Sequence, residues 1–226
     1  HADVVVSNHA FVAIDSFGGR QMLPEHDLLV VDEAHELADR VTSVITDELT
    51  APAIEAAARR ARRAGVEDTS MVDAAAETLE GVLAGTPAGR LEHGLSEALQ
   101  GAVTMVQDAA RGLLTALRAG SGEEKQVDGA KQLARAAVQE VFDVAERLAG
   151  VVATGGDDVV WVSRTRRPDG GERIGLHVAP LSVAGLLRER LYEERTVVLT
   201  SATLALGGSF EATAGAIGLR GEDPPP

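Results

Sequence analysis

The chain has 226 residues, 45% of them hydrophobic and 25% charged, with no cysteine; this composition excludes a disordered chain, a disulfide scaffold, and a zinc or iron–sulfur site held by thiolates of this chain. No run approaches the ~20 apolar residues of a membrane span, and no leader sequence is recognisable, so we expect a cytoplasmic protein that does not enter a membrane. The net charge of −14, from 35 acidic and 21 basic residues, argues by itself against nucleic-acid binding.

The first fifty residues alternate between apolar runs and helical spacing. Residues 2–6 form a short β-branched run that predicts a buried strand. Asn8 can cap a helix that runs to Phe17, and residues 28–31 (LLVV) predict a second buried strand. The apolar spacing over residues 34–49 predicts a helix. This alternation is typical of an α/β fold.

The middle of the chain carries only the helical period. Ser70 with Asp73, and Ser121 with Glu124, have the spacing of capping boxes. The last two helices are long and joined by a short link, which indicates an antiparallel hairpin. The helices that we expect cover residues 53–64, 70–83, 91–118 and 121–150.

The β signal returns after residue 150. Residues 159–165 and 173–179 flank the turn sequence PDGG and predict a hairpin. A helix over 181–192, a buried strand over 196–199 (TVVL) and a helix over 210–217 complete the chain. The fold class is therefore α/β with a large all-α insertion, divided into residues 1–48, 49–150 and 151–226.

Two adjacent acids end the strand 28–31. Asp32 and Glu33, followed by His35, stand where phosphate-handling α/β folds place a magnesium site at the carboxyl edge of the sheet. One carboxylate can hold a hydrated Mg²⁺ and the other can orient or deprotonate a water. The alternative is structural, because acids also favour the first turn of a helix that begins beside them.

Two further motifs come directly after apolar runs. The segment 200–203 (TSAT) comes after the strand 196–199, and its hydroxyls can bond to carboxylates at the end of a neighbouring strand. Asn8 and His9 come after the run 2–6. For both motifs, ordinary helix capping is the alternative.

Taken together, these motifs resemble the superfamily 2 helicases of the XPD/DinG type. ADVVVSNHAFVAID (residues 2–15) resembles the family's strand–NHA–helix segment, VVDEAHEL (30–37) its DEAH box, and VVLTSATL (197–204) its motif III. The family carries a helical arch between DEAH and TSAT, where this chain has its helical block. The resemblance implies a fragment: part of a RecA-like (P-loop NTPase) parallel sheet, residues 1–48 and 151–226, plus an arch domain over 49–150.

The resemblance also implies roles. Asp32 would coordinate Mg²⁺ through water, Glu33 would activate the attacking water, and His35 would join them in the catalytic set. The residues that would couple the nucleotide state to DNA are Thr200, Ser201 and Thr203, together with His35. The parent would be an ATP- and Mg²⁺-dependent helicase, of 5′-to-3′ polarity, that acts on single-stranded DNA in repair or replication. An iron–sulfur cluster is possible in the parent, but this chain has no cysteine to bind one.

A phosphate-binding Gly-Lys-Ser/Thr loop is missing, because neither Lys125 nor Lys131 comes directly after a glycine. We therefore expect the isolated chain to be inactive as an ATP hydrolase. The alternative to a helicase is a non-catalytic module, in which the helical block is a docking surface on an α/β scaffold. The complete acidic and hydroxyl motifs favour the helicase, since a scaffold has no physical need for them.

A dense basic run lies on the helix that ends near Gly65. Its members, candidates for contact with a DNA backbone, are Arg59, Arg60, Arg62 and Arg63. Asn8 and His9 are weaker candidates for the DNA-binding surface. The alternative for the arginines is a solvated helix C-terminus, which the helix dipole favours. Trp161 lies within a predicted strand, and we expect it to pack rather than to stack on a base.

Overall fold

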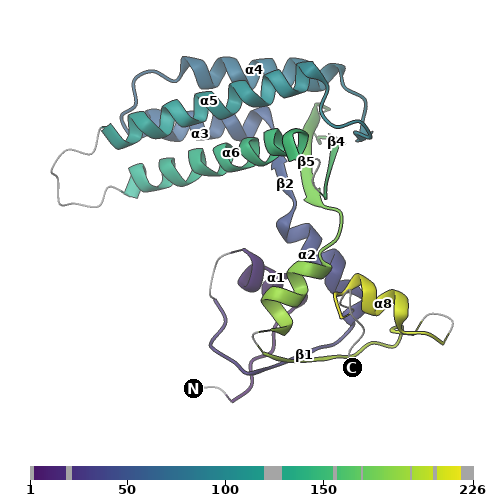
Figure 1. Cartoon of the computed structure of the whole chain (residues 1–226). Helices are drawn as coiled ribbons and strands as arrows, with labels where there is room; N and C mark the ends of the chain where they lie inside the picture. Colours follow the sequence, from purple (N-terminus) through teal and green to yellow (C-terminus); the bar gives the residue numbers. More distant parts are fainter. Residues whose placement is uncertain are drawn as a thin grey trace. The chain divides into compact units, whose positions relative to one another are not determined.

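The computed structural model describes residues 3–18, 22–119, 129–154, 157–168, 170–193, 195–205 and 208–219. The chain folds into two compact units (Figure 1). Residues 1–46 and 179–226 form the first, which we call the strand-end unit, and residues 47–178 form the second, the helical unit. Within the described part of the chain, no helix is long and apolar enough to cross a membrane.

The strand-end unit is built around two parallel strands, β1 and β6. Leu28 lies opposite Thr196, and Val31 lies opposite Leu199. Because both strands run the same way, the motifs at their carboxyl ends emerge at one edge of the sheet. The elements of this unit are α1 (His9–Phe17), β1 (Leu28–Val31), η1 (Ala34–Glu36), α2 (Leu37–Ile45), α7 (Ala184–Leu187), the π-helical η2 (Arg188–Tyr192), β6 (Thr196–Leu199) and α8 (Glu211–Ala216).

The core of the strand-end unit is small and one-sided. Val31 is buried, but Val30 is 60% exposed and Val198 44% exposed, so the predicted burial of both strands is only partly correct. The predicted strand over residues 2–6 is wrong for the described residues 3–6. A strand needs ladder partners, and this run pairs with neither β1 nor β6 and leaves Val4 and Val6 exposed.

The helical unit contains four long helices packed side by side (Figure 1). Helix α3 packs on α4 and α6, and α5 packs on the same two helices, so the four enclose one core. The elements of this unit are β2 (Asp47–Leu49), α3 (Ala51–Arg63), α4 (Ser70–Gly85), β3 (Gly89–Arg90), α5 (Glu97–Ala119), α6 (Gly129–Thr154), β4 (Asp158–Arg166) and β5 (Glu172–Pro180).

Helix α3 illustrates how the sequence sets these boundaries. The side chain of Thr50 caps the helix by accepting a hydrogen bond from the amide of Ala53, and Pro52 occupies the first turn, where its missing N–H costs nothing. Ile54 and Ala61 are fully buried on the inward face, as helical spacing predicts. The expected helix over 53–64 is thus confirmed, with an earlier start.

A four-stranded sheet of order β2-β5-β4-β3 belongs to the helical unit. Strands β4 and β5 confirm the predicted hairpin around PDGG, of which Asp169 lies outside the described residues. The hairpin packs with the helices because β2 pairs antiparallel with β5, and because Arg147 of α6 bonds Asp47 at 2.7 Å and Asp158 at 2.9 Å. The compact units therefore divide at 46/47 and 178/179. The expected division into motor domain and arch at 48/49 and 150/151 stays a prediction.

The helices predicted over 34–49 and from residue 91 differ most from the structure. The helix expected over 34–49 is a 3₁₀ turn and then α2, which ends at Ile45, and residues 47–49 join the sheet as β2. The helix expected from residue 91 begins at Glu97, because the amide of Leu91 bonds to the carbonyl of Val160 next to β3. The capping box expected at Ser121 lies outside the described residues.

Candidate active site at the strand ends

The parallel pairing of β1 and β6 brings the two strand-end motifs together. The amide of Thr200 donates to the carbonyl of Val31 at 2.8 Å, and the amide of Ala34 donates to the carbonyl of Thr200 at 2.9 Å. The main-chain pairing thus continues beyond both strands. It holds the segment 32–35 beside the segment 200–203. Asp32 and Thr200, which are 168 residues apart in the sequence, thereby come into contact.

Asp32 is held as an ionised carboxylate. Its Oδ1 accepts hydrogen bonds from the hydroxyl of Thr200 at 2.7 Å and from the amide of Glu33 at 3.0 Å. These two bonds, the hydroxyl first, hold the pKa of Asp32 below its ordinary value, and the nearby His9 adds to the effect. Both bonds go to Oδ1, and the carboxylate is exposed to solvent.

Glu33 has an unusual backbone. Its φ of 50° and ψ of 43° lie in the left-handed region, and it is the one non-glycine residue in the described part of the chain with a positive φ. This conformation costs a residue with a side chain on the order of 1–3 kcal/mol. The Glu33 carboxylate accepts a hydrogen bond from the hydroxyl of Ser201 at 3.1 Å. Strained backbone of this kind concentrates at functional sites.

Ser201 is the centre of a small polar network. Its hydroxyl bonds Nδ1 of His35 at 2.8 Å and accepts from the amide of Thr203 at 3.2 Å. Because its single proton goes to Glu33, Ser201 accepts from His35, which assigns the donor proton to Nδ1 of the imidazole. The same Nδ1 lies 3.3 Å from the Glu33 carboxylate. The structure thus brings the predicted acids, hydroxyls and imidazole into one cluster.

Asn8 and His9 lie at the start of α1. The side chain of Asn8 accepts from the amide of Phe11 at 2.9 Å, which is the capping role considered as its alternative. Nε2 of His9 lies 2.7 Å from the carbonyl oxygen of Asp32. Sequence reasoning missed this contact, because nothing in the local pattern relates two residues that are 23 positions apart. DNA contact by Asn8 or His9 stays a prediction.

The four arginines of the basic run occupy the end of α3. Arg59 pairs with Glu55 one turn earlier at 3.3 Å, and Arg62 pairs with Asp73 of α4 at 2.8 Å. The side chains of Arg60 and Arg63 are exposed in the last turn, where positive charge is favourable. Two of the four are thus engaged within the helical unit, and DNA contact by the run stays a prediction.

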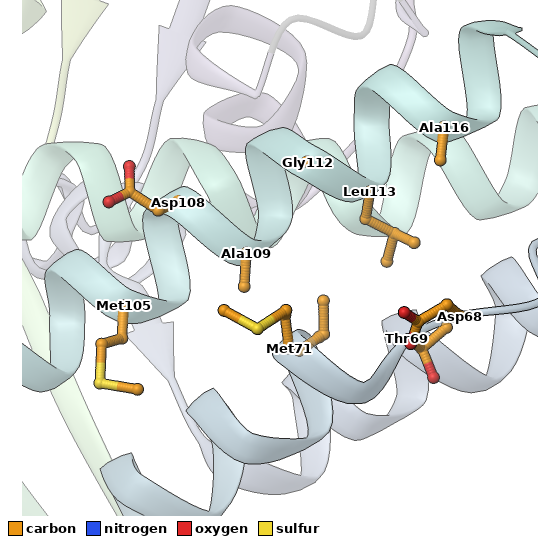
Figure 2. A pocket seen from close by; sticks show the side chains of 10 residues that line it. Asp68, Thr69, Met71, Met105, Asp108, Ala109, Gly112, Leu113 and Ala116 are labelled. Atoms are coloured by element: carbon orange, nitrogen blue, oxygen red, sulfur yellow. The ribbon is translucent and has the colours of Figure 1, made fainter.

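The helical unit also contains a mostly apolar hollow of about 320 Å³. Figure 2 shows the side chain of Met71 on α4 opposite Ala109 of α5, with Met105 further along α5. Of the acids in its lining, Asp68 accepts from the amide of Ser70 at 2.9 Å and Asp108 lies 3.6 Å from Arg111. Trp161 stacks on His177 with ring centroids 5.0 Å apart, which is a packing contact as expected. The acid–hydroxyl cluster is therefore the candidate active site.

The chain is similar in sequence to proteins described as helicases. The chain is 40% identical, over 99% of its length, to proteins described as ATP-dependent helicase DinG from Mycobacterium tuberculosis and from Mycobacterium bovis. It spans about a third (34%) of the length of these curated relatives. No protein-family model matches the chain.

Proposed function

Because the chain is homologous along its whole length to ATP-dependent helicase DinG, we propose that it supplies part of the nucleotide site of a DinG-type DNA helicase. In this proposal the strand-end unit is part of a RecA-like motor domain, and the helical unit is the arch inserted into it. The observation that carries the proposal is the cluster in which Asp32 and Glu33 meet the hydroxyls of Thr200 and Ser201. The proposed substrates of the whole protein are ATP and single-stranded DNA, in repair or replication.

The residues at the strand ends suit a magnesium ion. Mg²⁺ prefers hard oxygen ligands, keeps several waters, and is bound through one or two carboxylates together with substrate phosphates. Asp32 offers an exposed carboxylate whose lowered pKa keeps it ionised. No group of three or more acids and histidines suited to a metal occurs among the described residues, which agrees with a site completed by nucleotide and water. The ion, when bound, would neutralise phosphate charge during hydrolysis.

Glu33 is the proposed base that orients and deprotonates the attacking water. Its carboxylate is half-exposed and hydrogen-bonded to Ser201, so it is available at the edge of the sheet. Ser201 also bonds His35 and Thr203. A movement of the Glu33 side chain during turnover would therefore alter the hydrogen bonds that Ser201 makes with His35 and Thr203. This supports the proposed coupling between the nucleotide site and the segment 200–203.

One observation favours a second candidate function, a docking module. The hollow between α4 and α5 carries two exposed methionines, Met71 at 68% and Met105 at 42%, and flexible methionines suit binding surfaces. The acid–hydroxyl cluster has no use in such a module. The same experiment separates the two functions, because a docking module needs no carboxylate at Glu33.

The proposed function is tested by Glu33→Gln in the full-length protein that contains this chain. Loss of the base is expected to lower kcat for DNA-stimulated ATP hydrolysis by about 10²- to 10⁴-fold, while ATP binding is retained. Glu36→Gln is the matched control, because Glu36 lies on the same turn but pairs with Arg40 at 3.0 Å, outside the cluster. Equal activity of the Glu33→Gln variant and the wild type would overturn the proposal. The isolated 226-residue chain is expected to show no turnover.

A further inference from the structure

The peptide unit between Asp32 and Glu33 is held at both ends. Its carbonyl oxygen, which belongs to Asp32, lies 2.7 Å from Nε2 of His9. Its N–H, which belongs to Glu33, donates to the Asp32 carboxylate at 3.0 Å. A rotation of this peptide plane would break both hydrogen bonds at once. Of the two partners of this peptide, His9 is the one that comes from another element.

This peptide restrains the unusual backbone of Glu33 from one side, while the amide of Ala34, bonded to the carbonyl of Thr200 at 2.9 Å, restrains it from the other. The φ of 50° at Glu33 is the rotation about the bond between its backbone nitrogen and its Cα, and that nitrogen carries the N–H that is held. Without the bond to the Asp32 carbonyl, the peptide could turn and Glu33 could relax toward ordinary backbone angles. The carboxylate of Glu33 would then leave its place beside Ser201.

His9 is well placed for this task. It is the first residue of α1, whose start is fixed by the Asn8 cap, and α1 packs on α2 with Ala13 fully buried. The imidazole is half-buried. A carbonyl can only accept, so Nε2 must be the donor in this contact.

We propose that His9 is a positioning residue of the nucleotide site, which holds the Asp32–Glu33 peptide so that Glu33 stays in its left-handed conformation. The inference rests on the proposed function, because it is Glu33 that His9 positions. It assigns His9 a role different from the DNA contact expected from sequence. The two roles differ in their effects: a positioning residue affects turnover, whereas a DNA contact affects the DNA concentration needed for stimulation.

The test compares three substitutions in the full-length protein. Gln can place its amide donor near the position of Nε2, whereas Asn is too short and Ala has no donor. We expect His9→Ala and His9→Asn to lower basal kcat about 10- to 100-fold with KM for ATP unchanged, and His9→Gln to recover most of the loss. His26→Ala is the control, because His26 bonds Arg195 and the carbonyl of Pro24 instead.

Two kinetic results would overturn the inference. One is an unchanged basal kcat in His9→Ala with a raised half-stimulating concentration of a single-stranded oligonucleotide, which would make His9 a DNA contact. The other is a His9→Gln variant as impaired as His9→Ala. Failure of the proposed function is recognised separately, because it shows as a Glu33→Gln variant with wild-type activity.

A second readout needs no catalysis and uses the 226-residue chain. The amide and Cα chemical shifts of Glu33 are expected to move toward ordinary backbone values in His9→Ala and to stay near wild type in His9→Gln and His26→Ala. Unchanged Glu33 shifts in a folded His9→Ala chain would overturn the inference. A His9→Ala chain that does not fold would equally overturn it, since a positioning residue is not required for folding.

Discussion

The helical unit and the strand-end unit bury their apolar residues very differently. In the helical unit, four helices and a sheet enclose one continuous core, and few large apolar side chains are exposed. The strand-end unit has a much smaller core, and it holds most of the exposed large apolar side chains of the described residues, Val6 and Val30 among them. It also contains the strained Glu33 and the solvent-facing polar network around Ser201. The contrast is between a unit with a large apolar core and a unit that carries the candidate site at its surface.

The chain carries a separate optical probe for each unit. Its single tryptophan, Trp161, lies on β4 in the helical unit, and its single tyrosine, Tyr192, lies in η2 of the strand-end unit. Trp161 fluorescence therefore reports the unfolding of the helical unit, and Tyr192 absorbance, once the absorbance of Trp161 is subtracted, reports that of the strand-end unit. Substitutions in one unit, read with both probes, test how separate the two units are.

The largest effect is expected from a cavity in the helical core. Leu148 on α6 is fully buried, so Leu148→Ala is expected to cost about 2–5 kcal/mol in the unfolding free energy reported by Trp161 in urea. Leu133→Ala, on the same helix but 69% exposed, is the control and is expected to have little effect. A Tyr192 transition that moved together with that of Trp161 would show that the units unfold as one, and the comparison would fail.

A smaller loss is expected when the ion pairs of Arg147 are broken. Arg147→Met keeps most of the side-chain volume but leaves Asp47 and Asp158 without this partner, at an expected cost of about 1–3 kcal/mol by the same fluorescence measurement. Arg135→Met, at an exposed position on α6, is the matched control. If both variants unfold alike, the ion pairs of Arg147 add nothing measurable to the stability of the helical unit.

The strain at Glu33 predicts that two substitutions of this residue differ in the stability they give the strand-end unit. Glu33→Gly and Glu33→Ala both remove the carboxylate, but only glycine adopts a positive φ freely. The glycine variant is therefore expected to be the more stable by about 1 kcal/mol in the transition reported by Tyr192, with that of Trp161 unchanged. Equal stabilities would mean that the left-handed conformation costs nothing here.

The smallest effect on stability near neutral pH is expected from the substitution of Tyr192. Its hydroxyl donates to the carbonyl of Ile217 at 2.8 Å, and burial raises its pKa to about 12. Between the ordinary tyrosine pKa of about 10 and this value, the unfolded chain loses the proton while the folded chain keeps it, so stability falls as pH rises. An absorbance titration is expected to show phenolate forming near pH 12, and Tyr192→Phe is expected to remove this part of the alkaline destabilisation. Ionisation near pH 10 in the folded chain would contradict the burial.

The sequence predicted the elements of the candidate site because local signals determine them. Apolar runs marked β1 and β6, and two parallel strands present their carboxyl ends at one edge of the sheet, so the bond between Thr200 and Asp32 could be anticipated. The cap at Asn8 can be read from residue type and spacing alone. Elements determined by distant partners could not be found this way. Strand β2, with the sequence DEL, has no strand signal and forms because β5 lies beside it.

The same limit applies to His9 and Glu33. The bond from His9 joins elements whose contact depends on how α1 packs, and no periodicity encodes it. Glu33 adopts a conformation that its residue type disfavours, so propensity predicts the opposite. The arch role expected for the helical unit comes only from the resemblance, and DNA contact by the arginine run stays a prediction, since Arg59 and Arg62 make ion pairs that any packed helix could make.

The pairing of β2 with β5 gives the helical unit an evolutionary freedom. Asp47 lies opposite Val178, so the chain leaves for the helical unit and returns from it at two points roughly 5 Å apart. An inserted segment whose two ends lie next to each other does not distort the unit into which it is inserted, whatever the length of the segment. The residues between β2 and β5 (50–171) could be shortened, lengthened or exchanged for another folded module without altering the spacing of the two connections, as long as β2 and β5 are kept. One antiparallel pair of short strands thus makes a large domain a replaceable part.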